Sequence, residues 1–377
     1  MSPTVIYRNG QVFDGNTLSD GLALRVVDGV VDAVMADGSH DQADVTVDLD
    51  GQIISPGYTD LQVNGGGGVQ FNDDPSVASL RTIADAHRRL GVNALLPTLI
   101  TDTREKTEAA ITAVHGAVAA GVPGIAGLHL EGPHLSVARK GAHEAASIRP
   151  MEEADLQMLL KAREALPFLK VTIAPESVSE EQVAVLSNAG ICVSLGHTDA
   201  DFDTCLRYAR AGVRCVTHLF NAMSQLGSRA PGLVGAALQT DKLSAGLIAD
   251  LIHVHPASIR AAWRTKPAGS VFLVSDAMAV AGTDVAQFSL NGRFISRKDQ
   301  RLTLSNGTLA GADLDLTTAV RNLVTQVDVP LDQALAAATS APAGMLGKPV
   351  SSLVGSKAND LVSIRPDLSA VSRISQV

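Results

Sequence analysis

The feature that most constrains the fold is a series of eight short apolar segments that begins after Pro56. Amphipathic helical patterns separate most of these segments, near residues 76–90, 103–120, 152–165, 179–189, 199–211 and 256–265. The apolar segments themselves lie near residues 57–63, 92–98, 125–131, 169–175, 190–196, 214–218, 243–250 and 271–276. Such alternation predicts parallel strands that are buried on both faces, and eight repeats predict an α/β fold built on a TIM-like (β/α)8 barrel.

The two ends of the chain show a different pattern. Short β patterns closed by Asp-Gly and Asn-Gly pairs fill residues 1–54, as in hairpins, and the tail contains the strand-like "NDLVSI". We therefore predict a small β-sandwich domain formed by both chain ends (1–54 plus 349–377) and a barrel domain over 55–348. Residues 284–310 break the alternation and predict a β insertion after the eighth strand. Helical patterns resume near 313–326 and 331–345.

Composition limits which binding partners and which cellular compartment are expected. The 377 residues carry a net charge of −9, which argues against a nucleic-acid or anionic-membrane surface. The three cysteines show no paired spacing, and the N-terminus lacks the basic and apolar regions of a signal peptide. Residues 109–130 lack charged side chains, but Gly121, Pro123 and Gly124 interrupt them, which favours a helix followed by a strand over a membrane span. These features predict a cytoplasmic protein.

Polar residues follow several predicted strands at their carboxyl ends, where a barrel gathers its functional groups. Glu131 ends the third apolar segment, His197 follows the fifth, and His218 ends the sixth. A lone strand-end histidine is more often a hydrogen-bonded core residue. One carboxylate and two imidazoles at three strand ends instead suit a divalent transition metal with an open position for water. The pattern therefore predicts a metal site.

Asp276, at the end of the eighth segment, is the candidate general acid/base. A carboxylate there can accept a proton from a water at the metal and pass it to a leaving group, although a strand-end cap is the plainer role. Cys192 and Cys215 precede the two histidines by five and three residues. Odd separations point to opposite faces of a strand, so we expect core sulfurs rather than ligands.

The first apolar segment ends differently, in "TDLQVNGGGG". Gln62 and Asn64 lie two residues apart and therefore share one face of a strand. A polar turn is the plainer explanation of this pair. Neutral amides are poor zinc ligands compared with imidazole, thiolate or carboxylate.

A candidate phosphate seat follows His218 directly. Asn221 and Ala222 offer backbone and side-chain donors, and Arg229 lies in a Pro/Gly-flanked segment that is typical of a projecting loop. Taken alone, this segment is weak evidence, and a solvated surface residue is the plainer interpretation of Arg229.

Together the motifs identify a family. The chain resembles the N-acetylglucosamine-6-phosphate deacetylases of the amidohydrolase superfamily over nearly its full length. The matching stretches, in order, are "PGYTDLQVNGGGGVQFND", "GLHLEGPHLS", "KGAH", "APE", "SLGHTDA", "THLFNAM", "RAPG", "HVHP", "VSDAM" and "TLAG".

The resemblance implies deacetylation of N-acetyl-D-glucosamine 6-phosphate to D-glucosamine 6-phosphate and acetate, in amino-sugar catabolism or cell-wall recycling. It implies that Glu131, His197 and His218 bind the metal, and that Asp276 activates the attacking water and later protonates the amine. His143 would polarise the acetyl carbonyl. The sugar phosphate would contact Asn221, Ala222 and His253, with Arg229 reaching in from the partner of a homodimer, while Ala142 and Leu309 line the pocket.

The resemblance also gives the amide pair a meaning. Many amidohydrolases carry His-x-His at the end of the first strand, where it binds a second metal. Gln62 and Asn64 stand at that position here, as in the single-metal branch. We therefore expect one divalent metal ion per subunit, zinc first, with iron, cobalt or manganese as alternatives.

Two positions depart from the family pattern. His134 stands where a bulky aromatic residue is common, and Leu251-Ile252 precede His253 where a small residue is usual. Two other functions stay open at this point. One is an amidohydrolase acting on a cyclic amide or another N-acyl amino sugar, and the other is a non-catalytic sugar-phosphate binding protein.

Overall fold

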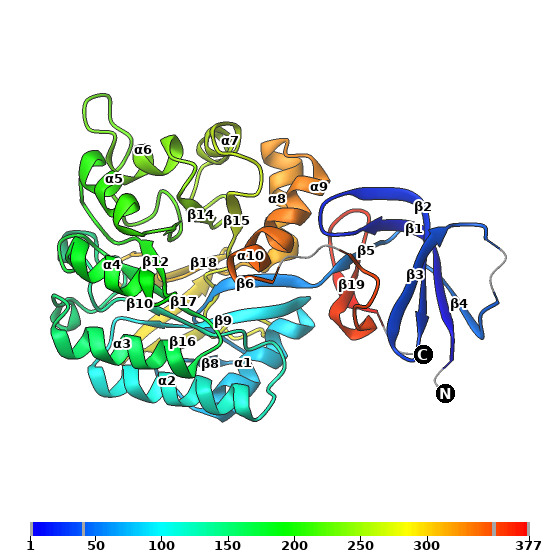
Figure 1. The fold of residues 1–377 in the computed structure, drawn as a ribbon, viewed down its shortest axis with the longest axis horizontal. Coiled ribbons are helices and arrows are strands. Elements are labelled where there is room, and N and C mark those ends of the chain that lie inside the picture. Colours follow the sequence, from blue (N-terminus) through cyan, green and yellow to red (C-terminus); the bar gives the residue numbers. More distant parts are fainter. Residues whose placement is uncertain (1–2, 40–41, 349–351, 375–377) are drawn as a thin grey trace.

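The computed structural model describes residues 3–39, 42–348 and 352–374, and it contains the predicted barrel (Figure 1). Eight parallel strands follow the order β15-β14-β13-β12-β11-β10-β9-β6. Their bounds are β6 Tyr58–Val63, β9 Val92–Ile100, β10 Leu128–Glu131, β11 Leu169–Ile173, β12 Cys192–Leu195, β13 Cys215–Val216, β14 Ser244–Leu247 and β15 Val271–Leu273. All eight predicted strands are confirmed, and most are shorter than predicted.

Helices cover the outside of this barrel. They are α1 Val77–Arg89, α2 Arg104–Ala119, α3 Glu153–Ala165, α4 Glu180–Asn188, α5 Phe202–Ala211, α6 Gly232–Gln239, α7 Pro256–Thr265, α8 Leu316–Val327, α9 Leu331–Ala338 and α10 Ser340–Met345. Several begin at side-chain caps, such as Ser76 for α1, Thr103 for α2 and Ser179 for α4, which satisfy otherwise unpaired backbone N–H groups. Three short 3₁₀ helices add η1 Val137–Arg139, η2 Ala145–Ser147 and η3 Ala358–Asp360.

Helix α6 was missed by the sequence analysis. Its sequence GLVGAALQ has buried residues on every side, including Leu233, Val234, Ala236 and Ala237. A helix that is apolar all round gives no amphipathic period, and two glycines weaken its propensity further.

Strands from both chain ends meet in a second sheet, which lies beside the barrel in Figure 1. Its seven strands follow the order β20-β19-β5-β1-β2-β3, with β4 paired to β1. The bounds are β1 Val5–Phe13, β2 Leu18–Val27, β3 Val30–Ala36, β4 Val45–Asp48, β5 Ile53–Pro56, β19 Leu361–Ile364 and β20 Val371–Arg373. The division into domains 1–54 plus 349–377 and 55–348 stays a prediction, and residues 349–351 at its second boundary lie outside the described residues.

The predicted insertion is a three-stranded antiparallel sheet of β16 Gln287–Leu290, β17 Arg293–Lys298 and β18 Arg301–Leu304. A smaller hairpin, β7 Gly65–Gly66 and β8 Val69–Gln70, follows β6. Its turn requires glycine at position 65, because a Cβ there would lie 2.4 Å from the Val69 carbonyl oxygen.

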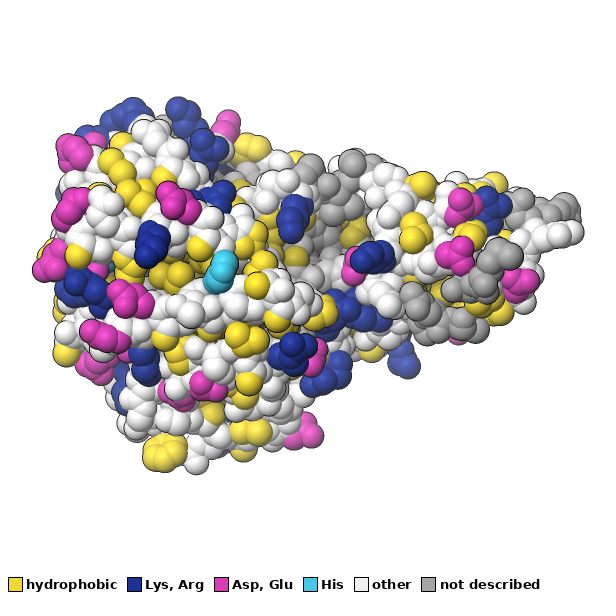
Figure 2. Space-filling view, turned by 60° about the horizontal axis from the view of Figure 1, so that its bottom comes forward, with side chains coloured by type: hydrophobic (Ala, Val, Ile, Leu, Met, Phe, Trp, Pro, Cys, Tyr) yellow, Lys and Arg dark blue, Asp and Glu magenta, His cyan; other side chains and the backbone are white. Residues whose placement is uncertain are grey.

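Charged side chains of both signs lie on the surface (Figure 2). On the face in Figure 2, basic and acidic side chains are interspersed rather than gathered into a field of one sign. Within the described ranges, no helix is both long and apolar enough to cross a membrane.

Candidate active site

A cavity of about 390 Å³ opens at the carboxyl ends of the barrel strands. It brings together residues from the ends of seven strands (β6, β9, β10, β12, β13, β14 and β15), from the loop around η1 and from the β16–β18 insertion. Its lining contains most of the predicted site residues, namely Asn64, Glu131, Ala142, His143, His197, His218, Asn221, Ala222, His253, Asp276 and Leu309.

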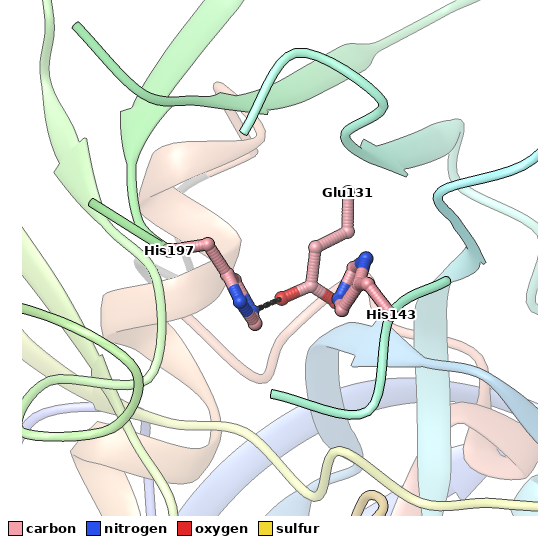
Figure 3. Close-up of side chains that lie close together, drawn as sticks. All are labelled: Glu131, His143 and His197. Atoms are coloured by element: carbon pink, nitrogen blue, oxygen red, sulfur yellow. Dashed lines mark hydrogen bonds and ion pairs between the residues drawn. The ribbon is translucent and has the colours of Figure 1, made fainter. Parts of the chain in front are cut away.

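Three side chains converge at one point of this cavity. The Glu131 Oε1 atom lies 3.1 Å from His197 Nε2 and 3.0 Å from His218 Nε2. The two imidazole Nε2 atoms are themselves 3.1 Å apart. His143 completes the group (Figure 3): its ring centroid lies 4.3 Å from that of His197, and ligand atoms of Glu131, His143 and His197 all lie within 4.8 Å of one another.

The backbone explains how these side chains turn inward. His197, His218 and Asp276 each follow a short strand and each has a positive φ, of 49°, 31° and 50°. Non-glycine residues rarely adopt this conformation, and such strain is concentrated at functional sites. The strands therefore end before these residues, which aim their side chains across the barrel mouth.

The loop after β10 holds His197 in place. The His197 Nδ1 atom is 2.8 Å from the Arg139 carbonyl oxygen, and the Ser136 N–H donates to the His197 carbonyl oxygen at 2.9 Å. Because Nδ1–H must be the donor to a carbonyl, neutral His197 presents a lone pair at Nε2.

This chemistry fits a divalent cation. A lone pair of His197 Nε2 and a carboxylate oxygen of Glu131 face each other without a hydrogen between them, unless the imidazole is charged. The Oε1 atom of Gln62 and the Oδ1 atom of Asn64 are buried nearby and lack a hydrogen-bond partner among the described residues. A cluster of electron-rich atoms that is short of donors is the arrangement that a metal ion satisfies.

The ionisation of the cluster follows from the same contacts. Burial would raise the pKa of Glu131, but the neighbouring imidazoles of His197 and His218 hold it well below the usual range. Burial would lower the pKa of His218, but the Glu131 carboxylate raises it. Glu131 is therefore an anion at neutral pH.

Asp276 lies on the opposite side of the mouth and is bonded by the two amides. Its Oδ1 atom accepts hydrogen bonds from Asn64 Nδ2 at 2.7 Å and from Gln62 Nε2 at 3.1 Å. Burial, and then the Glu131 charge, raise the pKa of Asp276, whereas His218 and the Asn64 amide lower it. Gln62 Nε2 also lies 3.2 Å from Glu131 Oε2, so this amide connects both carboxylates.

His143 is held as a neutral side chain. Its Nδ1 atom is 2.8 Å from Thr101 Oγ1, and its ring lies 4.3 Å from the His197 ring. Burial places the pKa of His143 well below its ordinary value. A neutral imidazole can donate one N–H to a substrate oxygen.

Asn221, Ala222 and His253, the residues of the predicted phosphate seat, line the same cavity. The Nδ1 atom of His253 is 2.6 Å from Asp250 Oδ2, while Asp250 Oδ1 accepts the backbone N–H groups of Ile252 and His253. Asp250 therefore fixes the His253 ring. Arg229 is exposed in the loop between β13 and α6 and is not part of the described lining of its own chain's cavity.

The two departures from the family pattern have local explanations. His134 is 2% exposed, and its Nδ1 atom lies 3.1 Å from the Arg149 carbonyl oxygen, so its ring is part of the loop packing. Leu251 adopts a φ of 64° in the turn that delivers His253.

Sequence reasoning assigned no role to several contributors. The Arg139 carbonyl and the Asp250 carboxylate form hydrogen bonds with predicted site residues, and Asp60 accepts the backbone N–H groups of Gln62 and Ser275. Asp250 stands out in the sequence as a polar residue at the end of the seventh apolar segment, three residues before His253, but their contact does not. For Arg139 the contact is made by a backbone carbonyl, for which sequence carries no signal.

Comparisons with known proteins agree with this geometry. The model of the amidohydrolase family matches residues 53–377. The N-acetylgalactosamine-6-phosphate deacetylase of Shewanella sp. (strain ANA-3) is 40% identical over 349 residues, 92% of this chain and 88% of that protein. The N-acetylglucosamine-6-phosphate deacetylase of Haemophilus influenzae is 32% identical over 321 residues, covering 84% of this chain and 83% of that protein.

A solved structure extends the likeness to three dimensions. The crystal structure of N-acetylglucosamine-6-phosphate deacetylase from Pasteurella multocida superposes with a TM-score of 0.92 at 31% identity. The match covers 99% of this chain and 98% of that one.

Proposed function

The chain belongs to the amidohydrolase family, and from this premise we propose that it removes the acetyl group of an N-acetylhexosamine 6-phosphate. With N-acetyl-D-glucosamine 6-phosphate, the products are D-glucosamine 6-phosphate and acetate. The observation that carries the proposal is the convergence of Glu131, His197, His218 and Asp276 in one cavity. A non-catalytic sugar-phosphate binding protein would have no use for this arrangement.

The metal is assigned to Glu131, His197 and His218, with zinc as the first expectation and iron, cobalt or manganese as alternatives. When bound, such an ion supplies a Lewis acid that polarises a carbonyl oxygen and lowers the pKa of a water molecule. We expect one ion per subunit, since Gln62 and Asn64 direct their N–H groups to carboxylates.

The remaining chemistry belongs to side chains of this chain. Asp276 accepts a proton from the attacking water as the new C–O bond forms, and it delivers that proton to the nitrogen as the C–N bond breaks. The raised pKa of Asp276 suits both roles, because a catalytic acid/base works best near the ambient pH. Neutral His143 donates its N–H to the acetyl oxygen, where negative charge develops.

The other end of the cavity binds the sugar phosphate. Asn221, Ala222 and His253 contact the phosphate, while Ala142 and Leu309 form the wall near the sugar and the acetyl group. Arg229 is exposed and is not among the residues that line its own chain's cavity, which is consistent with a homodimer in which it serves the partner's site. The free cysteines Cys192, Cys205 and Cys215 suit a reducing, cytoplasmic compartment.

A second substrate is favoured by a specific observation. The N-acetylgalactosamine-6-phosphate deacetylase of Shewanella is 40% identical to this chain, whereas the Haemophilus N-acetylglucosamine-6-phosphate enzyme is 32% identical. The two sugars differ at one hydroxyl, so both fit the proposed chemistry. The galacto epimer is therefore the second candidate.

Acetate release from both epimers, with and without added zinc, tests the function. We expect turnover of at least one phosphorylated sugar and a much lower kcat/KM for unphosphorylated N-acetylglucosamine. The ratio of kcat/KM for the two epimers then assigns the substrate. No acetate from either sugar phosphate by metal-loaded protein would overturn the proposal, and hydrolysis of cyclic amides instead would favour another amidohydrolase activity.

A further inference from the structure

In the part of the chain that the structure describes, the barrel is not closed by a ladder between its first and last strands, β6 and β15, and we call this junction the seam. Across the described residues, ladders join neighbouring strands from β15 round to β6, but no ladder joins β15 back to β6. A single bridge between Val63 and Ala277 marks the seam above the end of β15. Asp276 and its two amide donors stand on either side of it.

A buried carboxylate lies at this seam. Asp60, in β6, is 0% exposed, and its Oδ1 and Oδ2 atoms accept the Ser275 N–H at 3.2 and 3.3 Å. Oδ1 also accepts the Gln62 N–H at 3.2 Å. The Asp60 side chain therefore binds the backbone of both segments. Its partners are Ser275, which precedes Asp276, and Gln62, whose side-chain amide donates to Asp276.

The contacts above Asp60 depend on this alignment. The Asp276 N–H donates to the Gln62 carbonyl oxygen at 3.0 Å, and the Asn64 N–H donates to the Ala277 carbonyl oxygen at 2.8 Å. These bonds set the distances from Asp276 Oδ1 to its amide donors. The carboxylate of Asp60 supplies the acceptor that a continuous ladder would have supplied from a backbone carbonyl.

A carboxylate is a costly choice for this place. Burial raises the pKa of Asp60 to about 7, and its hydrogen bonds with Ser275 and Gln62 offset only part of that effect. An apolar side chain would avoid the desolvation cost but would leave two buried N–H groups unpaired. Because this desolvation cost is incurred next to Asp276, Asp60 is a candidate for fixing the position of the Asp276 carboxylate.

We propose that Asp60 is a positioning residue for Asp276, which aligns the two sides of the barrel seam so that Asp276 meets Asn64 and Gln62. The inference rests on the proposed function, in which Asp276 transfers the proton. Displacement of a reacting group by about 1 Å can cost about 100-fold in rate, so a lost seam contact should appear in kcat.

Asp60→Leu and Asp60→Asn separate position from fold, because the leucine lacks an acceptor and the asparagine keeps one oxygen in place. With the faster sugar phosphate, Asp60→Leu should lower kcat about 10- to 100-fold per bound metal and change KM less than about threefold. Asp60→Asn should recover most of that loss. Ser194→Ala is the matched control, since it removes a buried 2.6 Å contact with Thr217 at β12 and β13, away from the seam.

A double-mutant cycle with Asp276→Asn provides the decisive comparison. In Asp276→Asn the proton-transfer group is already absent, so its position no longer matters. Adding Asp60→Leu to that variant should therefore lower kcat by less than about threefold. An equal cost in both backgrounds would overturn the proposal, as would an unmoved Asp276 carboxylate in a crystal structure of the variant. If Asp60→Leu does not fold, Asp60→Ser, whose hydroxyl is too short to reach both segments, takes its place with the same criteria.

The two proposals fail in different ways. A parent protein that releases no acetate would refute the proposed function. If the parent is active but Asp60→Leu lowers kcat by the same factor with and without Asp276→Asn, only the role of Asp60 would be refuted.

Discussion

The two sides of the barrel mouth present opposite kinds of polar group. On the ligand side, at the ends of β10, β12 and β13, lone pairs of Glu131, His197 and His218 converge within 3.1 Å. On the seam side, at the ends of β6 and β15, amide N–H groups of Gln62 and Asn64 converge on Asp276. One side collects acceptors for a cation, and the other collects donors for a carboxylate.

The difference explains why a strand end of a hydrolytic site carries amides. Imidazoles at positions 62 and 64 would bring further lone pairs toward the metal and would draw Asp276 into ligation. Amides instead occupy its lone pairs with hydrogen bonds and leave it free to exchange a proton. In the proposed mechanism the seam side therefore serves proton transfer, and predictions for each side test this division.

The largest effect is expected on the ligand side. His197→Ala or His218→Ala should lose both the bound metal and all measurable activity, because each removes one of three ligands. Metal analysis should give about one equivalent per subunit in the parent and close to none in these variants. Gln62→Ala is the matched control on the seam side, and it should keep its metal. Two tightly bound ions in the parent, both needed for activity, would contradict the division.

The next largest effect belongs to Asp276. Asp276→Asn should keep the metal and substrate affinity but lower kcat by about 10²- to 10⁴-fold, the usual contribution of a proton-transfer group. Steady-state kinetics combined with metal analysis measures both properties on one sample. Activity within about tenfold of the parent would show that another group moves the proton.

The two sides also differ in how far sequence could predict them. The proximity of Glu131, His197, His218 and Asp276 could be predicted because each stands where an apolar run ends, and the topology of a barrel brings such ends together. Their strands are shorter than predicted because three of these residues leave the strand with positive φ. Asp60 was not found, since its bond to Ser275 spans 215 positions of the chain and the residue lies within an otherwise ordinary strand. Contacts across a seam depend on register, which short apolar runs do not encode.

A smaller effect is expected outside both sides, at the phosphate seat. If Arg229 binds phosphate in the partner subunit, Arg229→Ala should raise KM for the phosphorylated sugar about tenfold or more, and much less for the free sugar. Arg210→Ala, at an exposed position in α5, is a matched control.

Subunit exchange decides whether Arg229 acts across an interface. A mixed dimer of Arg229→Ala and Asp276→Asn has one site with both residues intact. With random pairing, about a quarter of all sites should recover parental kinetics, because half the dimers are mixed and each regains one of two sites. Activity no greater than the sum of the separate variants, with exchange verified, would place Arg229 elsewhere.

The smallest effect concerns stability, and it compares a carboxylate of the seam with one near the ligand side. Burial raises the pKa of Asp60 to about 7. Burial would also raise the pKa of Asp155, at the start of α3, but hydrogen bonds from Arg149 and from the Glu152 N–H hold it below its ordinary value. The two residues should therefore affect the pH dependence of unfolding in opposite directions.

The signs follow from proton binding. The pKa of Asp60 is about 7 in the folded protein, whereas an aspartate in the unfolded chain has a pKa near 3.9. The protonated side chain therefore contributes fully to the free energy of unfolding below about pH 4, and this contribution is lost as the pH rises to about 7. Asp155 contributes above about pH 4 and loses its contribution as the pH falls through its lowered pKa.

Matched Asp→Asn variants measure these slopes, because asparagine does not titrate. In denaturant unfolding of metal-free protein, the parent should lose stability relative to Asp60→Asn between pH 4 and 7, by at most about 1.4 kcal/mol per pH unit. Relative to Asp155→Asn, it should gain stability as the pH rises toward about 5 and then level off. A parent that kept a constant difference from Asp60→Asn across this range would show that Asp60 stays ionised, and that its hydrogen bonds at the seam outweigh its burial.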